Sequence, residues 1–498
     1  MQSRCVGYRS PHVGLVLLAT MLSGCVVGPD YAPPLIALPT HWGTKQPKEV
    51  QPPQLTQWWR RFKDPLLNGL IADAVAANLD VATAKAKIRE ARATRRVATG
   101  ALFPELTGSA AYTRYKNAMS QATGLSDSEI SGPFNQFQFG LDASWELDLF
   151  GANRRNVEAA TRGLEAAEEE LRSTLLTLVG DVASYYIQAR GYQLRIALAR
   201  RTGASQRNTA TLTRNKFQAG SASGVDVARA AAQASTTAAN IPAYQVSYAE
   251  AVHRLGVLLG REPALLMQTL GRGPASMPAP PPRLPTGMPA EILCNRPDVR
   301  KAERQLAQAT ANIGQAEAAL YPSVSLTGSI ATSGTRIGDL FKSSSISWSY
   351  GPSVSIPIFK GGALRAQVNV AEAQRDQYYL ALRSAVLSAL EDVENAIVSS
   401  VQHRVQAQRL TDAVQNYRQA ADLSRSLYES GASSFLDVLD AERSLYSAED
   451  SLLQTRVSVA LDYVALAKAL GGGWDGHIDS SMPEVIDVNT GPHLAPRH

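Results

Sequence analysis

The longest regular pattern in the chain is a hydrophobic seam within a proline-free run over residues 151–219. Its members recur at alternating steps of four and three, which keeps one helix face against a partner only when the helices supercoil left-handedly. The seam consists of Leu171, Leu175, Leu178, Val182, Tyr185, Ala189, Tyr192 and Ile196. At about 1.5 Å per residue, such a helix is on the order of 100 Å long, well beyond the diameter of an ordinary domain.

The second half of the chain repeats this pattern. Another proline-free run follows Ile358, with a seam at Leu410, Val414, Tyr417, Ala421, Ser424 and Tyr428. Each run ends in the same order of aromatic, glycine, serine and Asp-Val, over residues 216–227 and 427–438. The spacing between Asp226 and Asp437 also separates Gly260 from Gly471. The pattern therefore predicts an internal duplication.

Alternation of apolar and polar residues predicts two strands in each half. In the clearest case, Phe137, Phe139 and Leu141 alternate with Gln138 and Gly140. Half-buried strands of a soluble sandwich are the commoner outcome of such a pattern. Because four strands are too few to close a sheet alone, we favour a membrane barrel completed by other copies of the chain. The four expected strands cover about residues 104–115, 135–148, 322–332 and 346–357.

Prolines and glycines divide the rest of the chain. The expected order is a signal peptide (1–24), an extended N-terminal segment (25–57), a first repeat (58–263), a proline-rich connector (264–296), a second repeat (297–474) and a loose tail (475–498). Helices are expected from Trp58 to about Thr99 and over residues 152–219, 224–260, 362–430 and 435–470, with an exposed loop over 116–133.

The N-terminus has the features of a secretory signal, with Arg4 and Arg9 before an apolar stretch at 13–19. The sequence Leu22-Ser23-Gly24-Cys25 that follows resembles a bacterial lipobox, so Cys25 is predicted to become an acylated N-terminus. Each buried methylene of such an anchor adds ~0.8 kcal/mol. Val26, rather than an acid, follows the cysteine, which by this resemblance indicates the outer membrane. The alternative is a plain signal peptide with a chance cysteine.

Composition excludes several classes of protein. The 498 residues are 45% hydrophobic, 19% charged and 7% aromatic, and the net charge of +5 is spread without a basic block, so nucleic-acid binding is not indicated. The three cysteines, Cys5, Cys25 and Cys294, offer no disulfide framework. No apolar run outside the leader approaches the ~20 residues of a spanning helix, so a span is expected to consist of strands.

Catalytic patterns are also missing from the sequence. The stretch from Gly220 to Gly224 has alanine at the centre of a would-be nucleophile elbow, and the seven histidines lack metal-ligand spacing. No phosphate-binding or dinucleotide-binding fingerprint is present. We therefore expect no enzymatic activity, no cofactor and no metal.

Two turns between helices are the most distinctive local motifs. Gly220 and Gly431 stand where each helix must reverse, and the small residues beside them allow another backbone to approach. Asp226 and Asp437 follow near helix N-termini, where a carboxylate caps backbone donors for ~0.5–2 kcal/mol. An αα-hairpin turn with no further role explains the glycines equally well, but repetition of the whole turn favours recognition. The small residues are Ser221, Ala222 and Ser223 in the first turn and Ala432, Ser433 and Ser434 in the second.

A series of short motifs follows in order along the chain. They are Leu22-Ser23-Gly24-Cys25, Trp58-Trp59 with Phe62 and Asp64-Pro65, and residues 295–303, 309–316, 439–445 and 469–474. In this order they resemble the TolC-like outer-membrane efflux proteins, in their lipoprotein branch. Each motif is weak by itself, whereas the series is specific and covers the mature chain up to Trp474. Cys294 departs from the family pattern, and nothing follows from it.

The resemblance implies an α+β membrane protein, with a long α-helical coiled-coil tunnel and a trimeric transmembrane β-barrel of about twelve strands, four from each chain. It implies that the two turns meet a periplasmic membrane-fusion adaptor of an inner-membrane pump. It also places a closed constriction near Leu436 and Asp440. In a threefold assembly these residues would form rings of leucines and carboxylates, and the alternative for Asp440 is a solvated acid on an outer face.

The predicted function is a passive exit duct of a tripartite efflux system. It would carry small molecules such as drugs or toxic organics to the exterior as a homotrimer embedded in outer-membrane lipid. One alternative is a non-conducting lipoprotein scaffold built on periplasmic coiled coils, which would have no use for amphipathic strands. Another, a periplasmic enzyme, has no residue set for chemistry.

Overall fold

The computed structural model describes residues 26–39, 41–43, 55–116, 133–271, 276–281, 295–473 and 479–481. The chain divides into two compact units. The strand unit comprises Met1–Pro34, Glu90–Ala166 and Ala302–Ala381, and the helical unit comprises Leu35–Arg89, Ala167–Lys301 and Leu382–His498. The predicted signal peptide, Cys25, most of the loop at 116–133, Cys294 and most of the tail lie outside the described residues.

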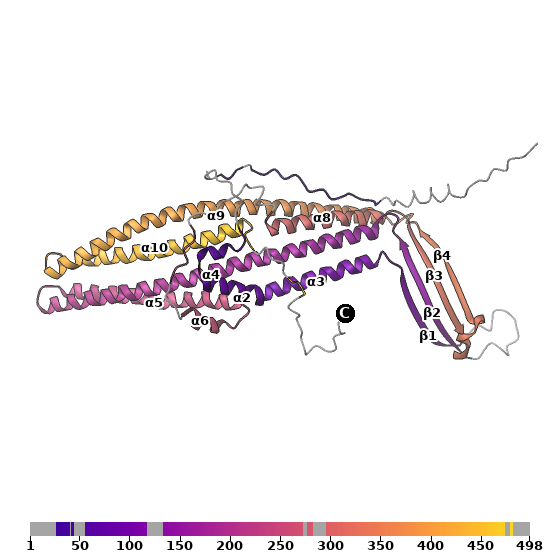
Figure 1. The fold of residues 1–498 in the computed structure, drawn as a ribbon, viewed down its shortest axis with the longest axis horizontal. Helices are drawn as coiled ribbons and strands as arrows, with labels where there is room; N and C mark the ends of the chain where they lie inside the picture. The colour runs from indigo at the N-terminus through magenta and orange to yellow at the C-terminus, as the bar shows by residue number, and fades with distance from the viewer. Residues whose placement is uncertain are drawn as a thin grey trace, which may run out of the picture. The chain divides into compact units, whose positions relative to one another are not determined.

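Four long helices dominate the chain (Figure 1). They are α4 (Ala152–Gln218), α5 (Gly224–Leu258), α9 (Ala363–Ser430) and α10 (Phe435–Ala469). Their bounds lie close to the expected ones, because the seams are long and the turns carry clear helix-ending signals. The order of a helix of 67 or 68 residues followed by one of 35 residues occurs in both halves.

The two seams are covered to different extents. In α4, Leu175 and Val182 are fully buried, whereas Tyr185 is only partly buried. In α9, Ala421 is buried but Tyr417 is 42% exposed. The described part of one chain therefore leaves sections of the α9 seam facing outward.

The strand unit holds one antiparallel sheet in the order β1-β2-β3-β4 (Figure 1). Its register places the apolar residues Leu141, Ile330 and Trp348 side by side on one face. The intervening positions place hydroxyl and carboxylate residues such as Asp142 and Ser349 on the other face. The predicted alternation is thus a property of the whole sheet. The strands are β1 (Glu105–Tyr115), β2 (Phe134–Leu147), β3 (Ser323–Gly334) and β4 (Ile346–Ser355).

The single helix expected from Trp58 to about Thr99 is wrong. The segment forms a 3₁₀ turn η1 (Trp58–Phe62) and helices α2 (Pro65–Ala77) and α3 (Leu79–Gly100). Asp64 caps α2 by accepting hydrogen bonds from the first backbone amides, and Pro65 follows it at a position where proline begins helices. Asn78 ends α2 and caps α3, since its Oδ1 accepts from Asp80 N at 2.9 Å.

Two further expectations need correction. The proline-rich connector begins with a short helix, α6 (Pro263–Gly271), which buries Leu266 and Leu270 and is not extended. The region Pro65–Gly100 has the length and apolar composition of a membrane span, contrary to expectation. In α2 the apolar residues Leu67 and Ile71 are buried within the protein, as in the core helix of a soluble domain.

An aromatic cluster in the helical unit packs together parts of the chain that are distant in sequence. Trp58, 1% exposed, packs edge-on against Tyr463 of α10 at 6.1 Å between ring centroids, and Phe62 lies 5.1 Å from the same ring. Trp58 Nε1 donates to Gly472 O at 3.1 Å. These contacts tie η1 to the end of the last long helix.

In the strand unit, an extended N-terminal segment is held at the start of α4. Arg155, whose side chain is 4% exposed, donates to Val27 O at 3.2 Å and Gly28 O at 3.1 Å and pairs with Asp30 at 2.8 Å. The segment passes so close to Gly151 that a Cβ there would lie 2.8 Å from Val26 Cγ1. A side chain at this glycine would displace the segment.

Replacing Trp58 by alanine is expected to lower the free energy of unfolding by roughly 3–5 kcal/mol, because it removes a fully buried aromatic ring and leaves Gly472 O without its donor. Thermal unfolding of the purified protein in detergent, followed by circular dichroism, measures the change. The matched control Val257→Ala, at a position 52% exposed in the same unit, should shift stability by no more than about 0.5 kcal/mol. An equal loss of unfolding free energy in the two variants would show that the aromatic cluster does not stabilise the helical unit.

Candidate functional site

The two predicted turns have the same geometry. Gly220 (φ +77°) and Gly431 (φ +84°) both adopt the left-handed conformation that ends a helix and favours glycine. Ser221 N donates to Lys216 O and Ala432 N donates to Leu427 O, each at 2.8 Å, so both helices end in Schellman motifs. Open space surrounds both glycines, and backbone conformation is therefore the reason for the residue type.

The next helix begins within a few residues of each turn, with a reciprocal capping box. Ser223 and Asp226 cap α5, and Ser434 and Asp437 cap α10. Hydrogen bonds from the hydroxyls of Ser433 and Ser434, and from Ser434 N, lower the pKa of Asp437. The carboxylate therefore stays ionised, as a helix N-terminus prefers.

The two tips pack against each other in the helical unit. Tyr428 of α9, Phe435 and Val438 of α10 and Ala230 of α5 form one buried cluster. The rings of Tyr428 and Phe435 meet edge-on at 6.0 Å. Tyr428 OH donates to Thr213 Oγ1 of α4 at 3.3 Å. The small residues of both turns are consequently held on one continuous end of the unit.

Leu436 and Asp440 lie on the opposite side of α10 from this cluster. Leu436 is 51% exposed and Asp440 is also exposed, whereas Phe435 and Val438 are buried. One helical turn separates the two residues, so they share a stripe on the uncovered face. This placement fits both a constriction in an assembly and a solvated outer surface.

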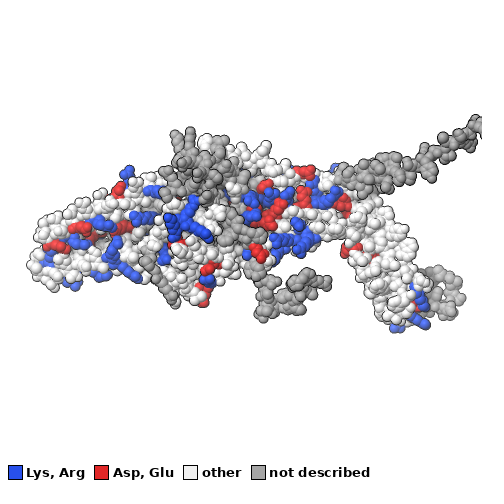
Figure 2. Space-filling model, in the orientation of Figure 1, with Lys and Arg blue, Asp and Glu red and all other residues white. Residues whose placement is uncertain are grey.

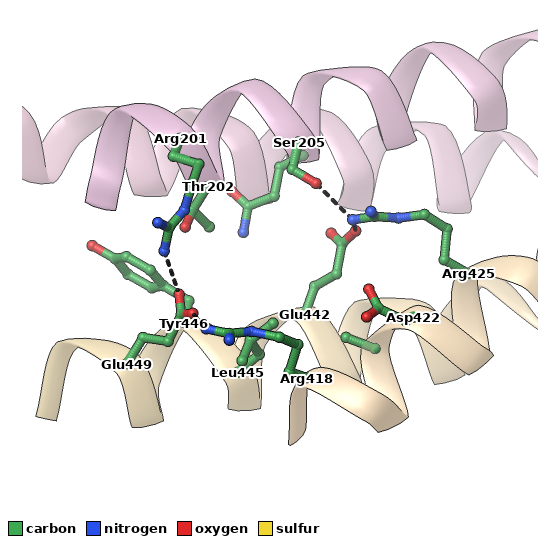
Figure 3. A pocket seen from close by; sticks show the side chains of 12 residues that line it. Arg201, Thr202, Ser205, Arg418, Asp422, Arg425, Glu442, Leu445, Tyr446 and Glu449 are labelled. Atoms are coloured by element: carbon green, nitrogen blue, oxygen red, sulfur yellow. Dashed lines mark hydrogen bonds and ion pairs between the residues drawn. The ribbon is translucent and has the colours of Figure 1, made fainter. Parts of the chain in front are cut away.

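Further along α10, charged residues from α4, α9 and α10 line a groove of about 470 Å³ (Figure 3). Arg425 Nη2 pairs with Glu442 Oε1 at 2.5 Å and donates to Ser205 Oγ at 2.6 Å. Glu442 also accepts from Thr209 Oγ1 at 2.9 Å. Since the side chain of Glu442 is only 8% exposed, its charge depends on these partners.

Further ion pairs join α10 to α4 and α9, within the groove and beyond it. Glu449 of α10 accepts from Arg201 of α4 at 3.1 Å and from Arg418 of α9 at 2.5 Å (Figure 3). Arg195 of α4 forms a bidentate pair with Asp450 at 2.8 and 2.9 Å, and its guanidinium lies 4.2 Å from the ring centroid of Tyr244 in α5. Polar contacts therefore hold the two hairpins together where apolar packing is thin.

Sequence reasoning did not predict the ion pair between Arg425 and Glu442. The signal was available, because Phe435, Val438 and Glu442 follow helical steps of three and four, which place an acid on an apolar stripe. A buried acid at such a position requires a cation nearby. The pairs formed by Glu449 and Asp450 had no such signal, since both residues lie in an ordinary charged stretch.

Within the described ranges, no group of three or more His, Cys, Asp or Glu side chains is placed to hold a metal ion. The features gathered at this end of the helical unit are two capped turns, an exposed Leu-Asp stripe and a network of ion pairs between helices. Such an arrangement offers a surface for recognition and a set of breakable contacts between helices.

Comparison with known proteins identifies relatives along nearly the whole chain. Residues 70–261 and 288–472 match the family model described as outer membrane efflux protein. The chain is 36% identical over 474 residues to nodulation protein T of Rhizobium leguminosarum bv. trifolii, covering 95% of this chain and 98% of that protein. It is 34% identical over 468 residues to the solvent efflux pump outer membrane protein SrpC of Pseudomonas putida, covering 91% and 96%.

Among solved structures, the outer-membrane channel OprN superposes with a TM-score of 0.83 at 35% identity, covering 90% of this chain and 100% of that one. The antiparallel sheet, the paired long helices and these matches lead to one assignment. The chain belongs to the outer membrane efflux protein family, and it is an outer-membrane channel protein of an efflux system.

Proposed function

We propose that three copies of this chain form a passive duct that receives small molecules from an inner-membrane pump and a periplasmic adaptor and releases them outside the cell. The observation that carries this proposal is the four-stranded sheet with one apolar and one polar face. In lipid, every backbone polar group needs a partner, so a sheet can span a membrane only as a closed barrel.

The edges of the sheet support completion by other copies. Each of β1 and β4 pairs with only one neighbour among the described strands, which leaves a row of backbone donors and acceptors on both edges. If β4 of one chain pairs with β1 of the next, three sheets close into a barrel of about twelve strands. The polar face would then line the lumen, and the apolar face would meet lipid.

We further propose that the chain arose by internal duplication. Each half contains two adjacent antiparallel strands, a very long helix and a helix of 35 residues, in the same order. The two turns share their left-handed glycine, Schellman hydrogen bonds and capping box. Duplication would give each trimer six similar hairpins at one end, which suits a ring-shaped partner.

For membrane attachment we propose acylation of Cys25, which lies outside the described residues. The following segment is held by Arg155 beside Gly151, directly after the strand β2 that we place in the membrane. This contact would keep an acylated N-terminus near the bilayer surface. Two or more acyl chains anchor a protein firmly.

For the tips we propose contact with the periplasmic adaptor. The small residues Ser221 and Ser223 of the first turn and Ala432 and Ser434 of the second are exposed, and they would allow another backbone to approach closely. The cluster around Tyr428 and Phe435 holds both tips at one end, so a partner would meet a preformed surface. Energy for transport would come from the pump, and the duct itself would carry out no chemistry.

For the constriction we propose Leu436 and Asp440, with the ion pairs further along α10 as the contacts that hold it closed. In a threefold assembly, their exposed stripe would give one apolar and one acidic ring. A displacement of α9 and α10 would break the contact between Arg425 and Glu442 and move the stripe outward. The alternative is a solvated Asp440 on an outer face, and it predicts that cross-linking the chains at position 440 leaves transport unchanged.

The named relatives suggest small organic molecules as cargo. One of them is a solvent efflux protein, and a further relative is named for toluene efflux. The polar face of the sheet carries hydroxyls such as those of Ser329 and Ser349, which hydrogen-bond to each other at 2.9 Å. Toward a cargo, such hydroxyls would offer weak and unspecific contacts. Selection of the cargo would therefore rest with the pump.

Purified full-length protein in a planar lipid bilayer is expected to be trimeric and to open discrete conducting channels, because only closure of the sheet satisfies its edges. Single-channel recording and native mass measurement test this directly. A product that remains monomeric and fully water-soluble after removal of its lipid would refute the proposal. A stable trimer that never conducts would favour the scaffold alternative.

Cross-linking at the constriction tests the gate. In Asp440→Cys, covalent linkage of the three chains should abolish efflux of a test drug, and cleavage of the linker should restore it, because linkage prevents the stripe from moving outward. Efflux is measured in cells lacking other ducts. Asp440→Ser controls for the lost carboxylate, and Arg443→Cys, exposed on the same helix, controls for the thiol. Normal transport by linked trimers would eliminate Leu436 and Asp440 as the gate.

Removing the guanidinium of Arg425 should destabilise the closed arrangement of the constriction. Arg425→Ala leaves Glu442 buried without its charged partner, at a cost of about 1–3 kcal/mol to the closed arrangement. The open probability in single-channel recordings should then rise about tenfold or more. Because Arg425→Ala/Glu442→Gln has no unpaired charge, it should show a smaller rise than the single variant. Arg443→Ala is the control, and an open probability unchanged in Arg425→Ala would contradict a role for this pair.

A further inference from the structure

A short helical turn covers part of the apolar face of the sheet and creates a groove there. The turn η2 (Ile337–Phe341) follows β3 and contacts both β3 and β2. Thr332 Oγ1 donates to Leu340 O at 2.8 Å and fixes the turn over the strand it follows. The groove between turn and sheet has a volume of about 740 Å³, which lies within the range of roughly 300–1,000 Å³ typical of ligand pockets.

The walls of this groove are almost entirely apolar. Tyr112, Phe137 and Phe139 contribute from the strands, and Ile337, Leu340 and Phe341 contribute from η2. Phe341 is 89% exposed and Ile337 is 65% exposed, so the structure leaves their apolar surface uncovered. Exposed apolar surface around a shaped groove indicates a binding site for an apolar group.

The rim of the groove is basic. Arg336 and Lys342 flank η2 directly, and Arg114 lies two positions beyond Tyr112 on the same face of β1. Lys and Arg side chains gather over this end of the strands in Figure 2. Asp339 is the acid within η2, and it pairs with Lys342 at 2.6 Å, which leaves Arg114 and Arg336 to provide the net positive charge.

The opposite end of the sheet differs in charge. Glu105 begins β1, and Glu146 stands one residue before the end of β2. The basic side chains and the almost entirely apolar groove therefore lie at the same end of the strands. This combination matches a ligand with an apolar chain and an anionic head, since Arg and Lys are the usual binders of phosphate.

We propose that the groove holds an acyl chain of an anionic, phosphate-bearing lipid of the membrane, with the phosphate at the rim formed by Arg114, Arg336 and Lys342. The inference rests on the proposed function, because it requires the apolar face to meet lipid. An occupant of this kind would cover Ile337 and Phe341 and would hold η2 against the sheet. Basic clusters beside apolar surface recognise anionic lipid head groups in this way.

The test uses the full-length protein purified in detergent and mixed with diphosphorylated lipid A, phosphatidylglycerol or phosphatidylethanolamine. Native mass spectrometry counts the lipids retained on the protein. Retention of at least one of the two anionic lipids is expected to exceed that of phosphatidylethanolamine about tenfold. Arg114→Gln/Arg336→Gln/Lys342→Gln should remove this preference, whereas Lys360→Gln, an exposed cation beyond the other end of β4, should preserve it.

A second variant tests the apolar part without changing charge. Ala110→Phe should fill the groove and reduce retention of whichever anionic lipid the unaltered protein prefers, and Val354→Phe, on the same face in β4, should not. Equal retention of all three lipids, or full retention by Ala110→Phe, would overturn the lipid site. If all variants remain trimeric and conducting, such a failure concerns the lipid site alone, whereas loss of trimers and conductance in the unaltered protein would refute the proposed function itself.

Discussion

The structure depends on the different chemical character of the two faces of its sheet. The strands bring Leu141, Ile330 and Trp348 together on one face and leave hydroxyls and carboxylates on the other. In a protein of one chain, the apolar face would need a core that the described strand unit does not supply, because residues such as Trp348 and Tyr350 remain 69% and 80% exposed. The chain belongs to the outer membrane efflux protein family, which supports the proposal that this face meets lipid.

The helical unit meets a different physical problem. Helices of 67 and 68 residues cannot be held by a single compact core, and part of the α9 seam, such as Tyr417, stays exposed. Two kinds of contact stabilise these helices. Apolar clusters form around Trp58 and around Tyr428, and ion pairs join the helices at other positions. Ion pairs exchange partners more readily than a packed core does, which suits the outward movement of α9 and α10 that we propose for opening.

Buried charge occurs in both units, but it serves different purposes. Arg155 contacts the carbonyl oxygens of an extended segment and so holds a piece of chain that has no secondary structure of its own. Glu442 contacts side chains of two other helices and so links elements that are already stable. Losing a partner would be costly in either place, because the remaining charge would be poorly solvated.

The sequence alone was sufficient for the long helices, the four strands and the two capped turns, because each depends on local periodicity or on residues within one turn. It also indicated the family through ordered short motifs. It could not show that Asn78 interrupts the first helix, where its side chain also donates to Leu258 O far along the chain. Nor could it show the turn η2 lying over the sheet, or the partner of Glu442. These features depend on contacts between segments distant in sequence, and only the tertiary structure brings those segments together.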